Sequence, residues 1–164
     1  KSAYRRTMEF TEAARNSQTQ AAANAAASEE RRARLDLALR GALPMLREIE
    51  SQRGKLSNSQ KLEARLLEAS LRDEIRGRGL MSAEIREAAK QARMRGVEVI
   101  ILDEGGLDNM TDYSRKEILQ KVADSFAQVS EGRITLRAPA QEDWKITLVA
   151  TRPGVAKPDI WLKF

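Results

Sequence analysis

The sequence predicts an α+β fold, in which a long helical hairpin is followed by a small α/β sandwich. Three observations support this prediction. Apolar residues recur at helical spacing through the first half, a β-branched run follows at residues 97–102, and alternating apolar segments close the sequence. We therefore expect a helical region at residues 1–80 and an α/β region at residues 81–164.

The composition limits the chemistry that this chain can perform. Its 164 residues include no Cys and no His, which removes disulfides, thiolate metal sites and the commonest general base. Charged residues make up 32% and aromatic residues 4%, which is typical of a helix-rich protein with a thin core. The net charge of +5 permits an anionic partner, but acids alternate with bases along the chain, so we expect no specific nucleic-acid partner.

Residues 2–50 are predicted to form one long helix. An Ala- and Gln-rich stretch favours helix at residues 19–27, and an apolar stripe follows it. The stripe consists of Leu35, Leu39, Ala42, Leu46 and Ile49. Its spacing alternates four and three, as in the seam of a coiled coil or helical bundle. Pro44 lies inside the stripe and should kink the helix or end it nearby, because proline lacks an N–H and crowds the preceding turn.

A second helix is expected over residues 59–76, with Ser57 or Asn58 as its cap and Gly77 at its end. Its apolar positions fall on one face and are Leu62, Leu66, Leu67, Leu71 and Ile75. Ser82 is expected to cap a third helix, which carries acids in its first turns and bases in its last.

The remaining segments predict a sheet and one further helix. Residues 97–102 form a buried strand, and residues 114–129 form a fourth helix with one apolar side. Three strands follow, at residues 133–137, 144–150 and 160–164. Short turns join these strands, so we expect them to pair antiparallel, with one or two helices covering the inner face.

The two tryptophans are predicted to face different environments. Trp144 is in phase with Ile146 and Leu148, so we expect it in the core. Trp161 is out of phase with the apolar positions of its strand, so we expect it to be exposed and to touch a partner.

Two clusters are candidates for sites. Residues 103–106 read Asp-Glu-Gly-Gly and could bind a cation, with a simple strand-ending turn as the alternative. A dense charge run consists of Arg72, Asp73, Glu74, Arg76 and Arg78. This run is interpreted either as an exposed salt-bridged face or as a docking surface that couples the helices to the α/β region.

The order of these elements resembles the sensor histidine kinases that pair with LuxR-type response regulators. The likeness covers about residues 28–154, and residues 71–99 are similar to the family's passage from its helical bundle into its catalytic domain. Residues 66–102 are also similar to a group of actinobacterial membrane proteins with histidine-kinase-like tails. The resemblance implies a hairpin that dimerises into a four-helix bundle, followed by a truncated histidine-kinase-type ATPase-like sandwich.

The residues that carry the chemistry of that family are missing here. Residues 29–37 contain no His where the family has its phosphoacceptor. Lys121 stands where the family has a Mg²⁺-binding Glu, and Ser125 stands where it has an Asn. Residues 151–154 read Thr-Arg-Pro-Gly where the adenine-binding Asp belongs, and few residues separate Gly154 from the last strand, so the ATP lid is absent too.

The resemblance therefore implies a pseudoenzyme of two-component signal transduction, which dimerises and relays or regulates a signal through protein contacts. We expect no catalytic residue, no cofactor and no bound metal. The expected homodimer interface comprises Leu35, Leu39, Ala42, Leu46, Ile49, Leu62, Leu66, Leu71 and Ile75. A response regulator or another sensor protein is the expected further partner.

No apolar run reaches the roughly 18 residues that a membrane helix needs. The sequence does not begin with Met, so we expect a fragment of a larger protein on the cytoplasmic side of the cell membrane, attached through a removed N-terminal part. Lys1, Arg5 and Arg6 would then lie just inside the membrane, or would simply begin an exposed helix.

Two alternative functions stay open. The chain could bind ATP at an unusual site and act as a sensor kinase on the histidine of a partner. It could instead be a coiled-coil-anchored nucleic-acid or protein interaction module unrelated to kinases, for which DNA binding with a steep salt dependence would be the signature.

Overall fold

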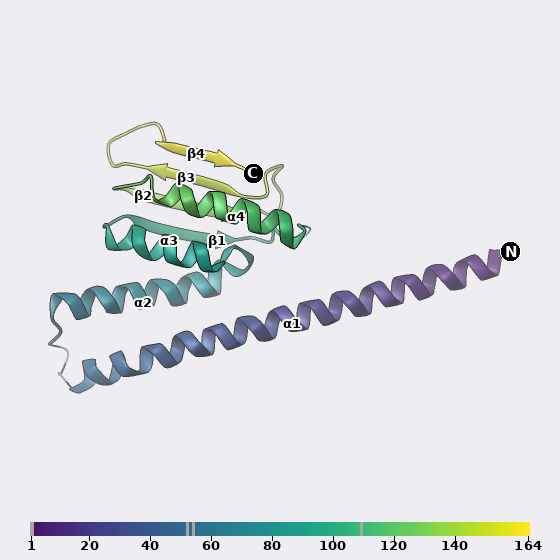
Figure 1. The fold of residues 1–164 in the computed structure, drawn as a ribbon, viewed down its shortest axis with the longest axis horizontal. Helices are drawn as coiled ribbons and strands as arrows, with labels where there is room; N and C mark the ends of the chain where they lie inside the picture. The colour runs from purple at the N-terminus through teal and green to yellow at the C-terminus, as the bar shows by residue number, and fades with distance from the viewer. Residues whose placement is uncertain (1, 52, 54, 109) are drawn as a thin grey trace. The chain divides into compact units, whose positions relative to one another are not determined.

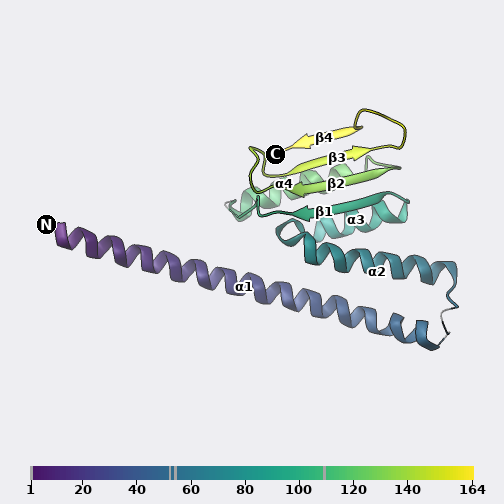
Figure 2. The ribbon, with the colours of Figure 1, turned by 180° about the vertical axis from the view of Figure 1, so that it is seen from behind.

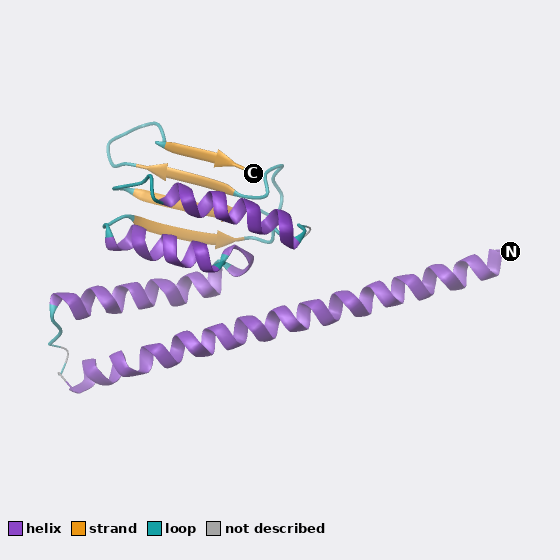
Figure 3. Ribbon diagram, in the orientation of Figure 1, coloured by secondary structure: helices purple, strands orange, loops and turns teal. Residues whose placement is uncertain are grey.

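The computed structural model describes residues 2–51, 53, 55–108 and 110–164, with the backbone alone at residues 2–11, 37 and 38. Its packing divides the chain into two compact units, Lys1–Leu37 and Ala38–Phe164. The described part is α+β, with four α-helices and one mixed four-stranded sheet (Figure 3). The predicted fold class is confirmed at this level. The basic cluster at residues 1, 5 and 6 lies outside the described side chains.

Helix α1 covers Ser2–Ser51, which confirms the single long helix (Figure 1). Pro44 lies inside it, and the helix continues to Ser51, so the proline does not end it. In the first unit every described side chain from residue 12 to residue 33 is exposed, and an ion pair joins Arg34 to Glu30 one turn away. This stretch therefore gains little packing energy within its own unit.

Helix α2 covers Asn58–Arg76 and begins with a capping box. Ser57 Oγ accepts the N–H of Gln60 at 3.2 Å, and Gln60 Oε1 accepts the N–H of Ser57 at 2.8 Å. Two of the N–H groups that a helix start leaves without a partner are satisfied in this way. The structure thus selects the first of the two caps that the sequence allows, and the helix ends at Gly77 as predicted.

A short 3₁₀ turn, η1 (Arg78–Leu80), leads from α2 to helix α3 (Ala83–Met94), whose cap is Ser82 as predicted. Helix α4 covers Asp112–Phe126. It begins before the predicted residue 114 because Thr111 Oγ1 accepts the N–H of Ser114 and so caps the helix earlier.

The four strands form one sheet in the order β1-β2-β3-β4. Their bounds are β1 Glu98–Asp103, β2 Arg133–Ala138, β3 Thr147–Thr151 and β4 Ile160–Lys163. Strand β2 pairs parallel to β1 because α4 forms the crossover between them. The predicted antiparallel pairing of the later strands is confirmed, since β2 pairs with β3 and β3 with β4 in that sense.

Helices α3 and α4 lie on the same face of the sheet (Figure 1). Seen from behind, the opposite face carries no helix of the unit Ala38–Phe164 (Figure 2). The core between the helices and the sheet includes side chains with no exposed surface, namely Ile85, Val122, Ile134, Leu136, Ile146 and Leu148. The α/β region therefore buries its alternating apolar residues within one unit, as the strand pattern predicts.

The chain enters β2 through a turn that requires a glycine. Gly132 has a φ of +91°, which disfavours residues with a Cβ, and a Cβ built there would collide with the carbonyl oxygen of Thr151 on β3. The close approach of β3 to this turn thus requires a residue without a side chain at position 132.

The prediction that Trp144 lies in the core is wrong. This side chain is 42% exposed, and β3 begins three residues later, at Thr147. The alternating pattern extends past the last paired residue, because Ile146 still exchanges hydrogen bonds with Phe164 and Trp144 lies before that pair. Residues beyond that pair are in a loop and need not follow the strand period. Trp161 is exposed as predicted, with 62% of its surface accessible.

Candidate functional site

The residues at the positions of the family's nucleotide site form ordinary structural contacts. Lys121 Nζ lies 2.8 Å from Glu117 Oε1, one turn away on α4, and both side chains are exposed. Ser125 is buried and donates to the Lys121 carbonyl oxygen at 2.9 Å. Arg152 pairs with Asp159 at 2.7 Å, and this contact lowers the pKa of the Asp159 carboxyl.

The acidic turn after β1 is also structural. Asp103 Oδ2 accepts the N–H of Gly79 at 2.7 Å, and its Oδ1 accepts the N–H of Gly105 at 2.9 Å. Glu104 forms two hydrogen bonds with Arg137 Nη2, of 3.0 and 2.9 Å. In the described part of the chain, no group of three acidic residues is placed to hold a metal ion. The turn interpretation fits these contacts better than the cation site.

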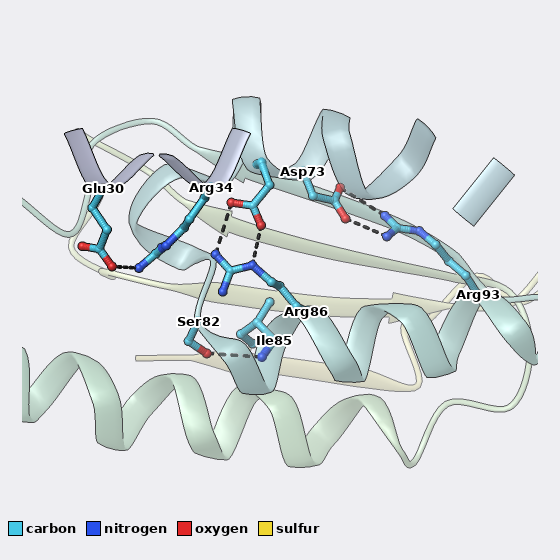
Figure 4. Close-up of polar contacts among 8 residues, drawn as sticks. Glu30, Arg34, Asp73, Ser82, Ile85, Arg86 and Arg93 are labelled. Carbon is cyan, nitrogen blue, oxygen red and sulfur yellow. Dashed lines mark hydrogen bonds and ion pairs between the residues drawn. The ribbon is translucent and has the colours of Figure 1, made fainter. Parts of the chain in front are cut away.

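A buried ion pair joins α2 to α3. The two oxygens of Asp73 accept hydrogen bonds of 2.6 and 3.1 Å from Arg93, and the side chains are only 4% and 12% exposed (Figure 4). Arg93 also donates to the carbonyl oxygen of Val99 on β1 at 2.9 Å. One guanidinium therefore connects the C-terminal end of α2, helix α3 and the first strand of the sheet.

A second ion pair lies beside the first. Glu74 accepts two hydrogen bonds from Arg86 of α3, one from Nε and one of 3.1 Å from Nη2. The Glu74 side chain is 8% exposed and that of Arg86 is 30% exposed. We call these four residues, Asp73, Glu74, Arg86 and Arg93, the ion-pair joint. Two of the five residues of the predicted charge run, the acids Asp73 and Glu74, are therefore buried, and its three arginines are exposed.

Burial is the main influence on the acid at the centre of the joint. It raises the pKa of Asp73 above the ordinary value of 3.8, and the hydrogen bond and charge of Arg93 oppose that rise. Arg93 is the cation that is hydrogen-bonded to this carboxylate, so loss of Arg93 would leave a buried charge that is largely uncompensated.

An apolar groove lies between α1 and α2, within the unit Ala38–Phe164. It has a volume of about 570 Å³. Its lining residues are Leu39, Ala42, Met45, Leu46, Ile49, Ala64, Leu67, Glu68, Leu71, Arg72, Ile75 and Arg76. Three of its apolar side chains are strongly exposed, since Leu39 is 48%, Leu46 58% and Ile75 62% accessible. Exposed aliphatic side chains that line one groove are typical of a protein–protein contact surface.

A second, more polar groove lies between α1, α2 and α3, with a volume of about 500 Å³. Its lining includes the apolar residues Pro44, Leu66 and Met81 and charged residues of the ion-pair joint, among them Asp73 and Arg93. The joint thus forms part of the wall between the α1–α2 pair and the α/β layer.

The structure divides the nine residues of the predicted dimer interface. Six of them line the apolar groove: Leu39, Ala42, Leu46, Ile49, Leu71 and Ile75. Leu66 lines the polar groove instead, Leu62 is exposed outside both, and Leu35 is a half-buried residue of the first unit. The apolar stripe of α2 does not line a single groove. The buried residues of this helix are Ala69, Asp73 and Glu74, which lie on the neighbouring face.

Sequence reasoning assigned no contact role to Arg86 and Arg93. Arg93 is one of the bases in the last turn of the third helix, which the sequence associates with the helix dipole. The sequence does contain two acids, at residues 73 and 74, and two bases, at residues 86 and 93, that could form ion pairs. A charge pattern does not reveal which of these residues are buried.

No protein-family model matches this chain, and no curated protein or solved structure matches it significantly. Among the described helices, none is both long enough and apolar enough to cross a membrane. The functional interpretation therefore depends on the apolar groove, the ion-pair joint and the resemblance in element order.

Proposed function

We propose that this chain is a non-catalytic signalling module of the histidine-kinase type. In this proposal α1 and α2 form a helical hairpin that dimerises into a four-helix bundle, and the α/β region is a degenerate ATPase-like domain. The observation that carries the proposal is the apolar groove, whose leucines and isoleucine are exposed in the single chain. Signals would pass as changes in helix packing rather than by phosphotransfer.

A second copy of the chain is the occupant that fits the groove best. A two-fold interface uses the same patch on both subunits, so a groove with an apolar stripe on one wall can receive the corresponding stripe of its partner. The α1 wall carries such a stripe at Leu39, Ala42, Leu46 and Ile49, with the four-three spacing of bundle seams. Burying each exposed Leu or Ile would contribute up to about 1.5–3 kcal/mol to association.

Charged residues also line the apolar groove, so the edge of the proposed interface would be polar and in contact with water. Arg72 Nη1 pairs with Glu68 at 2.9 Å, and both side chains are largely exposed. Arg76 lies on the same rim. A polar rim around an apolar centre is the usual organisation of a specific interface.

The ion-pair joint supplies the proposed route from the bundle to the α/β region. It fixes the last turns of α2 to α3 and, through the Arg93 contact with Val99, to β1. A rotation or shift of α2 in the bundle would have to move α3 with it or break two buried ion pairs, which is costly. The α/β region would then act as a docking surface for a response regulator or another sensor protein.

The contacts of Lys121, Ser125 and Arg152 support a role without nucleotide chemistry. A lysine at the position of a Mg²⁺ ligand repels the cation, and Arg152 brings no carboxylate for an adenine amino group. We further propose that the chain works on the cytoplasmic side of a membrane, attached through a segment that precedes it.

The dimer can be tested by sedimentation velocity on the wild type and on Leu46→Glu. We expect a dimer for the wild type and a monomer for the variant, because the substitution places a charge in the centre of the apolar groove. Leu43→Glu is the matched control, since Leu43 is 49% exposed on the same helix but does not line the groove. A monomeric wild type, or equal loss of dimer in both variants, would contradict the proposed interface.

The proposed coupling can be tested by hydrogen exchange. Dilution of the dimer to monomer should lower the protection of α2 and, through the joint, of α3 and β1. In the double variant Asp73→Leu with Arg93→Met, dissociation should still change protection in α2 but should change protection in β1 less than in the wild type, because only the Glu74–Arg86 pair of the joint remains. If β1 responds equally in both proteins, the joint does not transmit the change.

A further inference from the structure

The two outer strands of the sheet have differently protected edges. Strand β1 is flanked by α2, and the carbonyl oxygen of Val99 on β1 accepts a hydrogen bond of 2.9 Å from Arg93. Strand β4 is at the opposite edge and pairs with β3 alone in the described part of the chain. Open edges can pair with another strand, and proteins usually protect them.

The backbone groups on the outer side of β4 belong to Trp161 and Lys163. Phe164 and Ile146 exchange hydrogen bonds of 2.9 and 3.1 Å, so they form a hydrogen-bonded pair across β4 and β3. Hydrogen-bonded and non-hydrogen-bonded pairs alternate along an antiparallel pair of strands. Leu162 therefore directs its N–H and C=O toward β3, whereas Trp161 and Lys163 direct theirs away from the sheet. Among the described residues, these outward groups have no hydrogen-bond partner.

The side chains of the same two residues form an aromatic and cationic cluster on the helix-free face of the sheet. Lys163 Nζ lies 4.7 Å from the ring centre of Trp161 and 5.0 Å from that of Trp144. These are the two tryptophans of the chain, and both are exposed. Beside them is a hollow of about 300 Å³, lined in part by Val149, Pro158 and Trp161. Exposed tryptophans of this kind are common at the centre of interfaces.

Near this edge, basic side chains without an ion-pair partner outnumber such acids, since the Glu142 that lines the hollow lies 3.8 Å from Arg137. Lys145, Lys157 and Lys163 are exposed, and none of them forms an ion pair with a described residue. Asp159, which precedes the strand, is already paired with Arg152 at 2.7 Å. A strand with acidic side chains would therefore complement this edge, whereas a basic strand would be repelled.

We propose that the open edge of β4 binds an extended acidic segment of another protein, which adds to the sheet as a fifth strand. The segment exchanges main-chain hydrogen bonds with Trp161 and Lys163, places a carboxylate beside the Lys163 ammonium, and sets an apolar side chain against Trp161. A second copy of this chain is the poorer occupant, because it would bring the lysines of two edges together. The inference does not depend on the dimer or on the signalling role proposed above.

Tryptophan fluorescence tests this directly, because Trp144 and Trp161 are the only tryptophans and both flank the edge. The probe is a blocked octapeptide of alternating valine and glutamate. We expect a saturable change in emission with this peptide and none with two controls, one with lysine in place of glutamate and one with central prolines, which cannot pair as a strand.

Charge reversal at the edge sharpens the test. Lys163→Glu should weaken binding of the acidic peptide by about fivefold and allow the lysine peptide to bind. Lys116→Glu makes the same change in net charge on an exposed position of α4 and should leave the affinity unchanged. Trp161→Thr keeps a strand-forming residue and should also weaken binding, which is read with a dye-labelled peptide because one tryptophan is lost.

Three outcomes would overturn the proposal. The first is no emission change at millimolar acidic peptide, and the second is equal binding of the proline peptide, which would indicate charge attraction without strand addition. The third is self-association that Lys163→Glu alters but Leu46→Glu does not, which would make a second copy the occupant of this edge.

Discussion

Leucines have opposite environments in two regions of the unit Ala38–Phe164. Leu136 and Leu148 in the sheet have no exposed surface, whereas Leu39 and Leu46 in the apolar groove are 48% and 58% exposed. The α/β region therefore completes its own core, and the α1–α2 region does not. Because the hydrophobic effect is the same for both, the difference marks the apolar groove as the surface that the proposed dimer would cover.

The boundary between the two regions differs from both of them, because it is ionic. Two ion pairs with buried acids hold α2 to α3, although replacing a buried ion pair by apolar groups is often neutral or stabilising. Buried charges are directional, so they fix how α2 is oriented against the sheet as well as how close it lies. This is the property that a relay between two regions would need.

The largest effect should come from truncating the complete core. We expect Leu148→Ala to lower the free energy of unfolding by about 3 kcal/mol, because it leaves a cavity under α3 and α4. Leu46→Ala should change the unfolding of the dilute chain by less than about 0.5 kcal/mol. Urea denaturation of both variants at low protein concentration measures the contrast. Similar losses in both would mean that the groove is part of the folding core.

Removing an ion pair between α2 and α3 should lower the free energy of unfolding by a similar amount, but this loss should depend on pH. We expect Arg93→Met to lower the free energy of unfolding by about 3 kcal/mol at neutral pH, because Asp73 would remain buried without its cation. The pKa of Asp73 is already raised above 3.8 by burial and should rise further in this variant. A carboxyl whose pKa is higher in the folded state than in the unfolded state stabilises the fold at a pH below its unfolded-state pKa. This contribution is lost as the pH rises through its folded-state pKa.

The deficit of Arg93→Met should therefore be smaller at about pH 4 than at neutral pH, as measured by urea denaturation at both. The double variant Asp73→Leu with Arg93→Met should recover much of the lost stability, because it replaces both charges with apolar groups. A deficit that does not vary with pH, together with no recovery in the double variant, would show that Asp73 does not carry the cost.

A smaller effect is expected at the start of α2. Ser57→Ala removes the acceptor of the capping box and should lower the free energy of unfolding by about 1 kcal/mol. Circular dichroism during thermal denaturation would measure this, with the exposed Ser130→Ala as the control. A loss no larger than that of the control would mean that the α1–α2 pair holds this end of the helix without its cap.

The smallest effect is expected on nucleotide binding. Lys121→Glu restores the acid that the resembling kinases have, yet we expect calorimetry to detect no Mg²⁺–ATP binding in either protein, because Ser125 and Arg152 are unchanged. The fold of α4 should survive, since residue 121 is exposed. Measurable Mg²⁺–ATP binding by the unmodified chain would favour the alternative of an ATP-binding sensor kinase.

The helices and strands were largely predictable because their signals are local. Ser57 and Ser82 cap helices as their position before apolar stripes predicts, and residues 133–137 alternate in and out as a half-buried strand does. Trp144 was misplaced because an alternating pattern does not show where a strand loses its partner. That limit is set by how far β2 and the chain after β4 extend as partners, and both lie elsewhere in the sequence.

The candidate site was predictable only in part. The apolar stripe of α1 predicted one wall of the groove, since amphipathic spacing is readable in a single helix. Its counterpart on α2 was not resolved, because Leu66 and Leu71 were assigned to one face and line different grooves.

The sequence by itself determined the elements, their caps and the absence of histidine and cysteine chemistry, since these depend on residue types and on neighbours within a few positions. Only the tertiary structure decided that Asp73 and Glu74 are buried and paired with arginines of α3. It also decided that β4, and not β1, keeps an open edge. The physical reason is that burial and strand pairing depend on groups distant in the sequence, which a local pattern does not specify.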